Sequence, residues 1–288
     1  MEARHLEITS QTGLLGVLGH PVGHSLSPRM HNAALRAQGV DMIYVAFDVP
    51  PERLTYAVEG LRALGIKGAN ITVPHKERVV NLLDSVDPLA ARIGAVNTVV
   101  NDNGRLCGHN TDVAGFLSAL RSVKPDGARG LRCLVAGAGG AARAIVAALS
   151  EDEAAEIWVH NRTSRRAQTL CDSAAAWGRS LCKAVADNDL GARVQAADLL
   201  VNATSVGLAA SVKESAFPVD IVDSHHVVMD VVYGPRPTAL VAAARARGAV
   251  ALDGREMLIM QAAISYRLWT GLQPPIETMR KSLDIEER

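Results

Sequence analysis

The amino-acid sequence predicts an α/β protein with parallel sheets, organised as two domains. Strand-like and helix-like segments alternate along nearly the whole chain, which is typical of parallel strands joined by helices. A chain of 288 residues, 48% of them hydrophobic, is long enough for two ordinary domains with sizeable cores. The polar segment 124–130, KPDGARG, interrupts the alternation and is the best candidate for a linker.

The first part of the chain contains strand-like runs separated by helix signals. Strands are expected at residues 14–19, 41–49, 66–73, 96–100 and 105–109, and helices at residues 27–39, 50–65 and 112–123. Ser27 and Pro28 predict the N-cap and the first position of the first helix. Asn103 and Gly104 predict a hairpin between the last two strands, because both tolerate positive φ.

The second part begins with a strand, a glycine-rich turn and a helix at residues 131–150. Further strands are expected at residues 156–163, 198–207, 225–234 and 249–254, and helices at residues 164–178 and 237–248. The region 179–195 is the least regular and predicts at most one short strand. The final helical segment, 255–271, is so apolar that we expect it to pack against the rest of the protein.

Composition excludes several classes of partner. Lys plus Arg and Asp plus Glu both number 30, so there is no basic field for nucleic acid or an anionic membrane. The expected partners are therefore small molecules. The four cysteines include no CxxC pair, which suits a reducing compartment. No apolar leader segment or run of about twenty apolar residues is present, so we expect a soluble cytoplasmic protein.

The segment Asn70–Lys76, NITVPHK, is a candidate catalytic motif. A strand-like run stops at Pro74, which suits the first position of a helix, so Lys76 is expected in that helix's first turn. There the positive end of the helix dipole disfavours the ammonium group. A lysine in that place, with a carboxylate such as Asp112 beside it, is suited to proton transfer. The alternatives are a surface lysine at a strand–helix junction and an N-cap role for Asp112.

The glycine-rich segment 137–144, GAGGAARA, is a candidate dinucleotide-binding turn. Gly137, Gly139 and Ala142 fit the G-x-G-x-x-G/A pattern between a strand and a helix. Glycines let the backbone approach a pyrophosphate, which then rests on N–H groups at the helix start. The alternative is a tight turn with no ligand.

The next strand indicates which dinucleotide is bound. NAD-binding proteins place a carboxylate at the end of this strand, where it holds the ribose 2′-hydroxyl. Here the strand ends without an acidic residue, in Asn161, Arg162 and Thr163, followed by Arg165 and Arg166. Guanidinium groups suit a 2′-phosphate through charge-assisted hydrogen bonds, so the sequence favours NADP over NAD. The alternative is a solvated basic helix start, which the helix dipole disfavours.

The segment 19–32, GHPVGHSLSPRMHN, combines histidines and serines. The intervening prolines and glycine keep His20 and His24 from sharing a helical face, so we expect no metal site. Ser25 and Ser27 alternate just ahead of a helix, and both hydroxyls can converge on one anionic group. N-capping by Ser27 is compatible with that role.

The side-chain amides of three residues each allow two interpretations, a structural hydrogen bond or a ligand contact. Asn97 and Asn110 can satisfy either buried backbone groups or ligand hydroxyls, and sequence does not separate the two. Gln261 falls inside the apolar segment 255–271, where its amide needs a partner, either a ligand or a structural hydrogen bond.

Together these motifs resemble the shikimate dehydrogenase family, in order and over nearly the whole chain. The resemblance is carried by GHPVGHSLSPRMHN, NITVPHK, GAVNTVV, GHNTD, GAGGAARA, NRT, NATSVG, DVVYGPRPTAL and GREMLIMQA. It implies an α/β substrate domain, residues 1–112 completed by C-terminal helices in 253–288, and an inserted Rossmann-type NADP-binding domain, residues 113–252. The implied activity is the reversible, NADP-linked reduction of 3-dehydroshikimate to shikimate in aromatic amino acid biosynthesis, with no metal.

The resemblance also implies a role for individual residues. Lys76 and Asp112 match the family's catalytic pair. The residues that match substrate contacts are Ser25 and Ser27 at the carboxylate, and Thr72, Asn97, Tyr233 and Gln261 around the ring and its hydroxyls. Those that match cofactor contacts are Gly137, Ala138, Gly139, Gly140, Ala141, Asn161, Arg162, Thr163, Arg166, Val231 and Gly254. The sequence departs from the family's usual residues at His75, Val113 and Arg255, which could alter substrate preference.

Two alternative functions stay open. A quinate/shikimate dehydrogenase with relaxed substrate and cofactor use would share the chemistry. A non-catalytic, NADP-responsive regulator would share the scaffold, but it needs no proton-transfer pair such as Lys76 and Asp112. The expected oligomeric state is a monomer or a homodimer.

Overall fold

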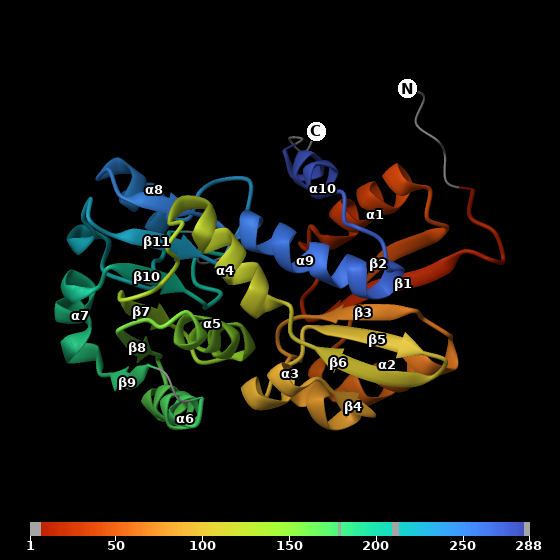
Figure 1. Ribbon diagram of the computed structural model, residues 1–288, viewed down its shortest axis with the longest axis horizontal. Helices are drawn as coiled ribbons and strands as arrows, with labels where there is room; N and C mark the ends of the chain where they lie inside the picture. The colour runs from red at the N-terminus through yellow and green to blue at the C-terminus, as the bar shows by residue number, and fades with distance from the viewer. Residues whose placement is uncertain (1–6, 178–179, 209–212, 285–288) are drawn as a thin grey trace. The chain divides into compact units, whose positions relative to one another are not determined.

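The structure is a computed structural model that describes residues 7–177, 180–208 and 213–284. It confirms the α/β class and divides into two compact units (Figure 1). The first unit takes in the chain up to Thr111 and again from Leu258, and the second unit is Asp112–Met257. The chain therefore leaves the first unit once and returns to it. In the part of the chain described here, no helix is both long and apolar enough to span a membrane.

The first unit contains a six-stranded sheet in the order β2-β1-β3-β5-β6-β4. Its strands are β1 (Gly13–Gly19), β2 (Met42–Asp48), β3 (Gly68–Ile71), β4 (Ser85–Val86), β5 (Thr98–Asp102) and β6 (Arg105–His109). β1 runs parallel to β2 and β3, whereas β5 is antiparallel to β3 and to β6. The expected β5–β6 hairpin is confirmed, with φ of 51° at Asn103 and 93° at Gly104. This hairpin makes the sheet mixed.

Two layers of helices cover the first sheet. The helices of this unit are α1 (Ser27–Gln38), α2 (Leu54–Ala63), α3 (Pro88–Ile93), most of α9 (Gly254–Thr270) and α10 (Ile276–Leu283), with 3-10 helices η1 (Pro51–Arg53) and η2 (Arg78–Leu82). Leu15 and Val17 of β1 pack in one core with α1, α9 and α10. Leu18 packs in a second core with α2, η2 and α3. The alternation follows the period of two along a strand. Figure 1 shows α9 and α10 beside α1, so the apolar segment 255–271 does pack on the first unit.

The second unit contains a six-stranded sheet in the order β12-β11-β10-β7-β8-β9, and its strands are all parallel. The strands are β7 (Arg132–Ala136), β8 (Glu156–His160), β9 (Leu181–Val185), β10 (Leu199–Asn202), β11 (Val227–Asp230) and β12 (Val250–Leu252). The helices are α4 (Asp112–Val123), α5 (Gly140–Glu151), α6 (Ser164–Ala175), α7 (Leu190–Ala196) and α8 (Ala239–Ala246), with 3-10 helices η3 (Asp187–Asp189) and η5 (Val219–Ile221). The strand order reverses between β7 and β10, as in a doubly wound, Rossmann-type sheet.

Several local expectations are wrong. Pro74 does not begin a helix, because a turn follows it and the 3-10 helix η2 starts only at Arg78. Ser27 is the first helical residue of α1 and not its N-cap, which is Leu26. The region 179–195 contains one short strand, β9, as expected, but also the 3-10 helix η3 and most of helix α7, which were not expected. The short helix α3 was also missed, although Asp87 caps it by accepting a 2.7 Å hydrogen bond from the N–H of Ala90.

Candidate active site

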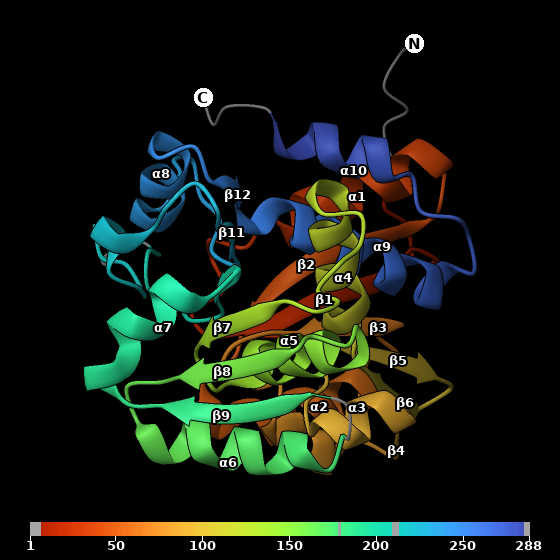
Figure 2. The same cartoon turned by 60° about the vertical axis from the view of Figure 1, so that its left-hand side comes forward.

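A cavity of about 350 Å³ lies at the carboxyl ends of β7, β8 and β10 in the second unit. Its lining is Ala136, Gly137, His160, Asn161, Arg162, Thr163, Arg166, Thr204, Ser205, Val206, Ser215 and Ala216. Five of the expected cofactor residues are therefore gathered around one cavity. It lies where the strand order reverses, which is the place where doubly wound sheets bind dinucleotides. Figure 2 shows β7, β8 and β9 side by side, with α6 following β8.

Gly137 forms the sharp turn after β7. Its φ is 114°, and a Cβ at this position would lie 3.0 Å from the carbonyl oxygen of Ala203. The Gly137 N–H donates to the carbonyl oxygen of His160 across 2.8 Å, which holds the turn beside the end of β8. A side chain would therefore both strain the backbone and enter the turn.

Helix α5 begins directly after this turn. Its N-cap is Gly139, which has no side chain to accept hydrogen bonds from the first N–H groups of the helix. Ala138 lies in the turn, and Gly140 and Ala141 are the first helical residues. Backbone N–H groups at such an end, together with the helix dipole, suit a phosphate group. The residues present therefore fit the pyrophosphate of a dinucleotide.

The loop after β8 supplies the positive charge of the cavity. Arg162 and Arg166 are exposed. The Asn161 Nδ2 donates to the carbonyl oxygen of Thr163 across 3.0 Å, and this hydrogen bond fixes the turn that contains Arg162. Among the described residues, the cavity lining includes no Asp or Glu. The carboxylate of Asp187 lies outside that lining and pairs with the Nε2 atom of His160 at 2.8 Å. This charge distribution suits a 2′-phosphate better than a free 2′-hydroxyl.

Val231 and Gly254 are in contact with each other. A Cβ at Gly254 would come within 2.1 Å of the Val231 carbonyl oxygen, and the Gly254 N–H donates to the Val232 carbonyl oxygen across 3.1 Å. Gly254 thus lets the start of α9 lie against the chain just after β11. Neither Val231 nor Gly254 lines the cavity at Gly137.

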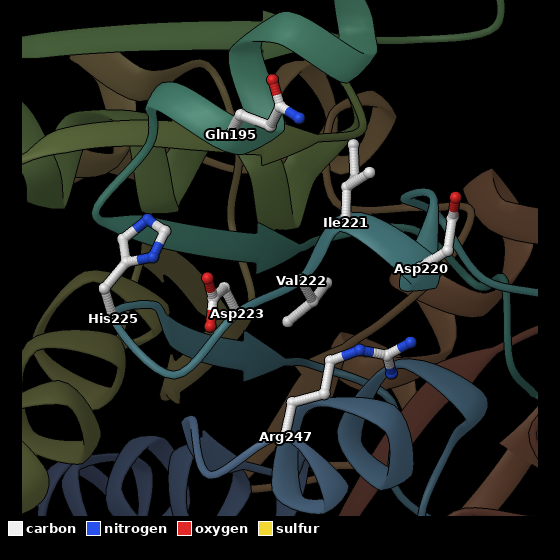
Figure 3. Close-up of a pocket in the computed structure, with 7 residues that line it drawn as sticks. All are labelled: Gln195, Asp220, Ile221, Val222, Asp223, His225 and Arg247. Carbon is white, nitrogen blue, oxygen red and sulfur yellow. The ribbon is translucent and has the colours of Figure 1, made fainter.

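A larger cavity, about 520 Å³, lies elsewhere in the second unit (Figure 3). It is lined by Gln195, Asp220, Ile221, Val222, Asp223, His225 and Arg247. These residues precede β10, β11 or β12, so the cavity lies at the amino ends of those strands. Ligands of open α/β sheets bind at the carboxyl ends, and none of the expected site residues lines this second cavity.

In the first unit, the structure brings Asn97 and Gln261 together. The Asn97 Nδ2 donates to the Gln261 Oε1 across 3.3 Å and to the Thr111 Oγ1 across 2.9 Å. Asn97 is 2% exposed and Gln261 is 8% exposed. Helix α9 therefore carries Gln261 back to the strand that follows Asn97, although the two residues are far apart in the sequence.

A buried network of hydroxyl and amide groups surrounds this pair. The Ser265 Oγ of α9 lies 2.8 Å from the Thr98 Oγ1 of β5 and accepts from the Asn70 Nδ2 across 3.1 Å. The Asn70 Oδ1 in turn accepts from the Tyr44 hydroxyl across 2.7 Å. Each of these groups is neutral, so the network fixes orientation without burying a charge.

Sequence reasoning did not identify Thr98, Thr111 or Ser265 as part of this site. Thr98 and Ser265 were signalled only as polar residues in an apolar strand and an apolar helix, whereas Thr111 lies in the GHNTD motif just before α4.

Ser25 and Ser27 lie together at the start of α1. The Ser25 Oγ accepts a 3.3 Å hydrogen bond from the Ser27 N–H, and Ser27 is buried. The N-cap residue Leu26 makes no side-chain cap. Two hydroxyls at a helix N-terminus of this kind suit an anionic group such as a carboxylate.

Lys76 lies in the turn between β3 and η2, so the helix-dipole argument does not apply to it. Long-range contacts hold this turn in place. The Lys76 carbonyl oxygen accepts from the Val96 N–H across 2.8 Å, and the His75 Nε2 donates to the Val49 carbonyl oxygen across 2.7 Å. Burial lowers the pKa of His75, which keeps its ring neutral. His75 is therefore a structural residue of the turn that carries Thr72 and Lys76.

Asp112 and Tyr233 belong to the second unit. Asp112 is buried and is the first residue of α4, directly after Thr111, whose N–H donates to the Asn97 Oδ1 across 2.8 Å. Tyr233 is half-buried and follows β11.

The histidines of segment 19–32 have separate surroundings. The His20 Nδ1 lies 2.9 Å from the Asp48 Oδ1, whereas His31 is buried and stacks on Tyr44 with ring centroids 4.4 Å apart. Burial lowers the pKa of His31 to about 3. No group of three or more metal-ligating side chains occurs within the described ranges.

The two units together define a class of protein. The second unit is a doubly wound parallel sheet with a glycine turn and a basic loop, and the first is a separate α/β unit with clustered polar side chains. This combination is typical of a two-domain, dinucleotide-dependent oxidoreductase.

Family models identify the family within this class. Residues 17–99 match the model of the shikimate dehydrogenase substrate binding domain, and residues 120–232 match that of shikimate/quinate 5-dehydrogenase. Residues 254–283 match the model of the shikimate 5′-dehydrogenase C-terminal domain. The chain belongs to the shikimate dehydrogenase family, which confirms the resemblance of the motifs.

Three similar proteins illustrate the range of this family. A shikimate dehydrogenase (NADP(+)) of Moorella thermoacetica is 46% identical, over 96% of this chain and 95% of that protein. The crystal structure of shikimate 5-dehydrogenase from Thermus thermophilus in complex with NADP(H) and shikimate is 41% identical, with a TM-score of 0.83, and covers 94% of this chain and 98% of that one. Quinate dehydrogenase from Corynebacterium glutamicum in complex with NAD is 38% identical, with a TM-score of 0.86 and the same coverage, 94% and 98%.

Proposed function

We propose that the chain catalyses the reversible, NADP-dependent reduction of 3-dehydroshikimate to shikimate. The observation that carries this proposal is the cavity of the second unit, which has Arg162 and Arg166 and no acidic residue in its described lining. Relatives that match over nearly their full length are named NADP-dependent shikimate dehydrogenases. The location that we propose is the cytoplasm, and the oligomeric state a monomer or homodimer.

In this proposal each unit supplies most of the contacts to one reactant. Residues 1–112 with 253–288 form the substrate domain, and residues 113–252 form the NADP domain. The two compact units of the structure, which divide after Thr111 and after Met257, support a closely similar partition. Ser25 and Ser27 bind the substrate carboxylate, and Thr72, Asn97, Gln261 and Tyr233 contact the ring and its hydroxyls. The cofactor lies on the turn Gly137–Ala141, the loop Asn161–Arg166, Val231 and Gly254.

The proposed chemistry divides between cofactor and protein. Bound NADPH supplies the hydride for the ring carbonyl carbon. The Lys76 ammonium donates a proton to the alkoxide that develops on the carbonyl oxygen, and the Asp112 carboxylate holds that ammonium in place. In the reverse direction the Lys76 amine accepts the proton of the substrate hydroxyl. The neutral amides of Asn97 and Gln261 fix the ring, so that this hydroxyl faces Lys76.

A second candidate function is a quinate/shikimate dehydrogenase that also uses NAD. It is favoured by the similarity to the quinate dehydrogenase found in complex with NAD. Quinate carries an additional hydroxyl on the ring carbon that bears the carboxylate, so its acceptance depends on the space beside Ser25 and Ser27, the residues proposed to bind that carboxylate.

One spectrophotometric assay tests both candidates. Shikimate and quinate are each offered with NADP and with NAD, and reduced nicotinamide is followed at its absorbance band. We expect the largest kcat/KM for shikimate with NADP. Comparable values for quinate with NAD would favour the second candidate, and absence of turnover in all four combinations would exclude both enzymes. Light scattering after size-exclusion chromatography measures the oligomeric state.

A further inference from the structure

The fold brings two of the four cysteines into contact, although they form no short sequence motif. Cys171 lies on helix α6 and Cys182 on strand β9. Their Sγ atoms are 2.8 Å apart, with the Cys182 thiol donating to the Cys171 sulfur. Both thiols are free, so these two sulfur atoms already face each other without a covalent bond.

One member of this pair lies near the surface. Cys182 is half-buried on β9, which is the edge strand of the second sheet, whereas Cys171 is 3% exposed. The other two cysteines differ in position. Cys133 is buried on β7 in the centre of the same sheet, and Cys107 belongs to the first unit. A reagent in solvent can therefore reach Cys182 first, and Cys171 is the thiol placed to react next.

We propose that Cys171 and Cys182 form a reversible disulfide bond that ties helix α6 to edge strand β9. The oxidant is a low-molecular-weight disulfide. The Cys182 thiolate attacks this disulfide, forms a mixed disulfide and displaces one thiolate of the reagent. The Cys171 sulfur then attacks the Cys182 sulfur and displaces the second thiolate. The two protein thiols lose two electrons and two protons, and the reagent is reduced to two thiols.

The surroundings of the pair set the speed of this reaction. The hydrogen bond to Cys171, and then burial, raise the pKa of the Cys182 thiol. The reactive species is the thiolate, so a raised pKa slows the first attack at neutral pH. The pair is thus suited to a slow response to sustained oxidation and not to rapid turnover.

The position of the pair predicts that the disulfide braces the second unit without closing its cavity. Arg166 lies in the first turn of α6 and lines the cavity, whereas neither cysteine does. Cys171 lies further along the same helix and Cys182 lies on the outermost strand. A covalent link there restricts the unfolded chain and holds an edge strand that has only one strand neighbour.

The experiment uses the full-length protein, fully reduced and then incubated with oxidised glutathione. Thiols are counted under denaturing conditions, and tryptic peptides are mapped by mass spectrometry without reduction. Trypsin cleaves after Arg179, so the disulfide would link two separate peptides, residues 167–179 and 180–183. We expect this linked pair, with a mass lower by two hydrogen atoms than that of the separate peptides. The control variant Cys107→Ser should still form the linked peptide pair, whereas Cys171→Ser should not.

Three outcomes would overturn the proposed bond: retention of all four thiols, glutathione that stays attached to Cys182, or a link between two protein molecules. The proposed stabilisation of the second unit by the disulfide is tested separately, by thermal unfolding and by NADP binding. The oxidised protein should unfold at a midpoint about 5–10 °C above that of the reduced protein, with NADP affinity within about twofold. An unchanged midpoint, or loss of NADP binding on oxidation, would overturn the bracing role.

Discussion

Replacing Ser265 by alanine tests whether the buried hydroxyl network positions the residues proposed to bind substrate. The Ser265 Oγ accepts from the Asn70 Nδ2, lies 2.8 Å from the Thr98 Oγ1 and donates to the Gln261 carbonyl oxygen across 3.1 Å. The Ser265 Oγ also lies 3.4 Å from the Thr111 Oγ1, so the substitution removes four contacts at a position that is 0% exposed. The substitution therefore alters the hydrogen bonds that position Gln261 directly and those that position Asn97 through Thr98.

The remaining contacts limit the size of the effect. After the substitution, the Asn70 Nδ2 still donates to the Asn97 carbonyl oxygen across 3.1 Å, and the Thr98 hydroxyl still donates to the Asn97 Oδ1 across 3.1 Å. No group is left without a partner, so the loss corresponds to one or two ordinary hydrogen bonds, about 1–2 kcal/mol. If between half and all of this free energy appears in substrate binding, the KM for shikimate rises about 2- to 30-fold. We expect kcat and the KM for NADP to stay within about twofold.

Ser282→Ala provides the matched control. Ser282 is also a buried serine on a C-terminal helix, 8% exposed, but its hydroxyl donates to the Met279 carbonyl oxygen of the same helix, α10. Steady-state kinetics with shikimate and NADP varied in turn, together with thermal denaturation, compares the two variants. A shikimate KM that changes equally in both, or does not change in Ser265→Ala, would refute the positioning argument.

Three further predictions concern single side chains. Lys76→Ala should lower kcat about 10²- to 10⁴-fold with a much smaller change in KM, and near-normal turnover in the same steady-state assay would make Lys76 structural. Arg162→Ala should weaken NADP binding about 10- to 150-fold in titrations and leave NAD binding nearly unchanged, whereas equal losses would indicate a folding defect. His31, with a pKa lowered to about 3, stays neutral when folded, so its contribution to stability is complete above the unfolded pKa of about 6.5 and is lost as pH falls. His31→Phe should flatten denaturation midpoints between pH 6.5 and about 4, and an unchanged pH dependence would contradict this.

Local signals in the sequence predicted the parts of the molecule that short-range geometry determines. Asn103 and Gly104 specify a hairpin wherever they occur between strands, and Gly137 specifies the turn before α5. The basic loop after β8 could be predicted for the same reason, because the charges lie beside one another in the chain.

The parts of the structure that the sequence did not predict depend on contacts between segments far apart in the chain. The turn at Lys76 replaces the expected helix because Val49 and Val96 hold His75 and Lys76 through hydrogen bonds from other segments. Pro74 suits the first position of a helix, and nothing local in the sequence marks the distant contacts that hold a turn there instead. The contacts of Ser265 with Thr98 depend in the same way on the return of α9 to the first sheet.

The discontinuous first unit has a consequence for the order in which the chain can fold. Leu15, Val17 and Tyr44 are made early, but part of the core that buries them, including Ala262, Tyr266 and Met279, is made much later. During synthesis α1 therefore covers this face of the first sheet only in part until α9 and α10 have left the ribosome. The second unit, Asp112–Met257, is continuous and needs no later segment to complete its sheet, so it can reach its final structure first. The nascent protein thus passes through a stage in which an apolar surface is open to chaperones or to other chains.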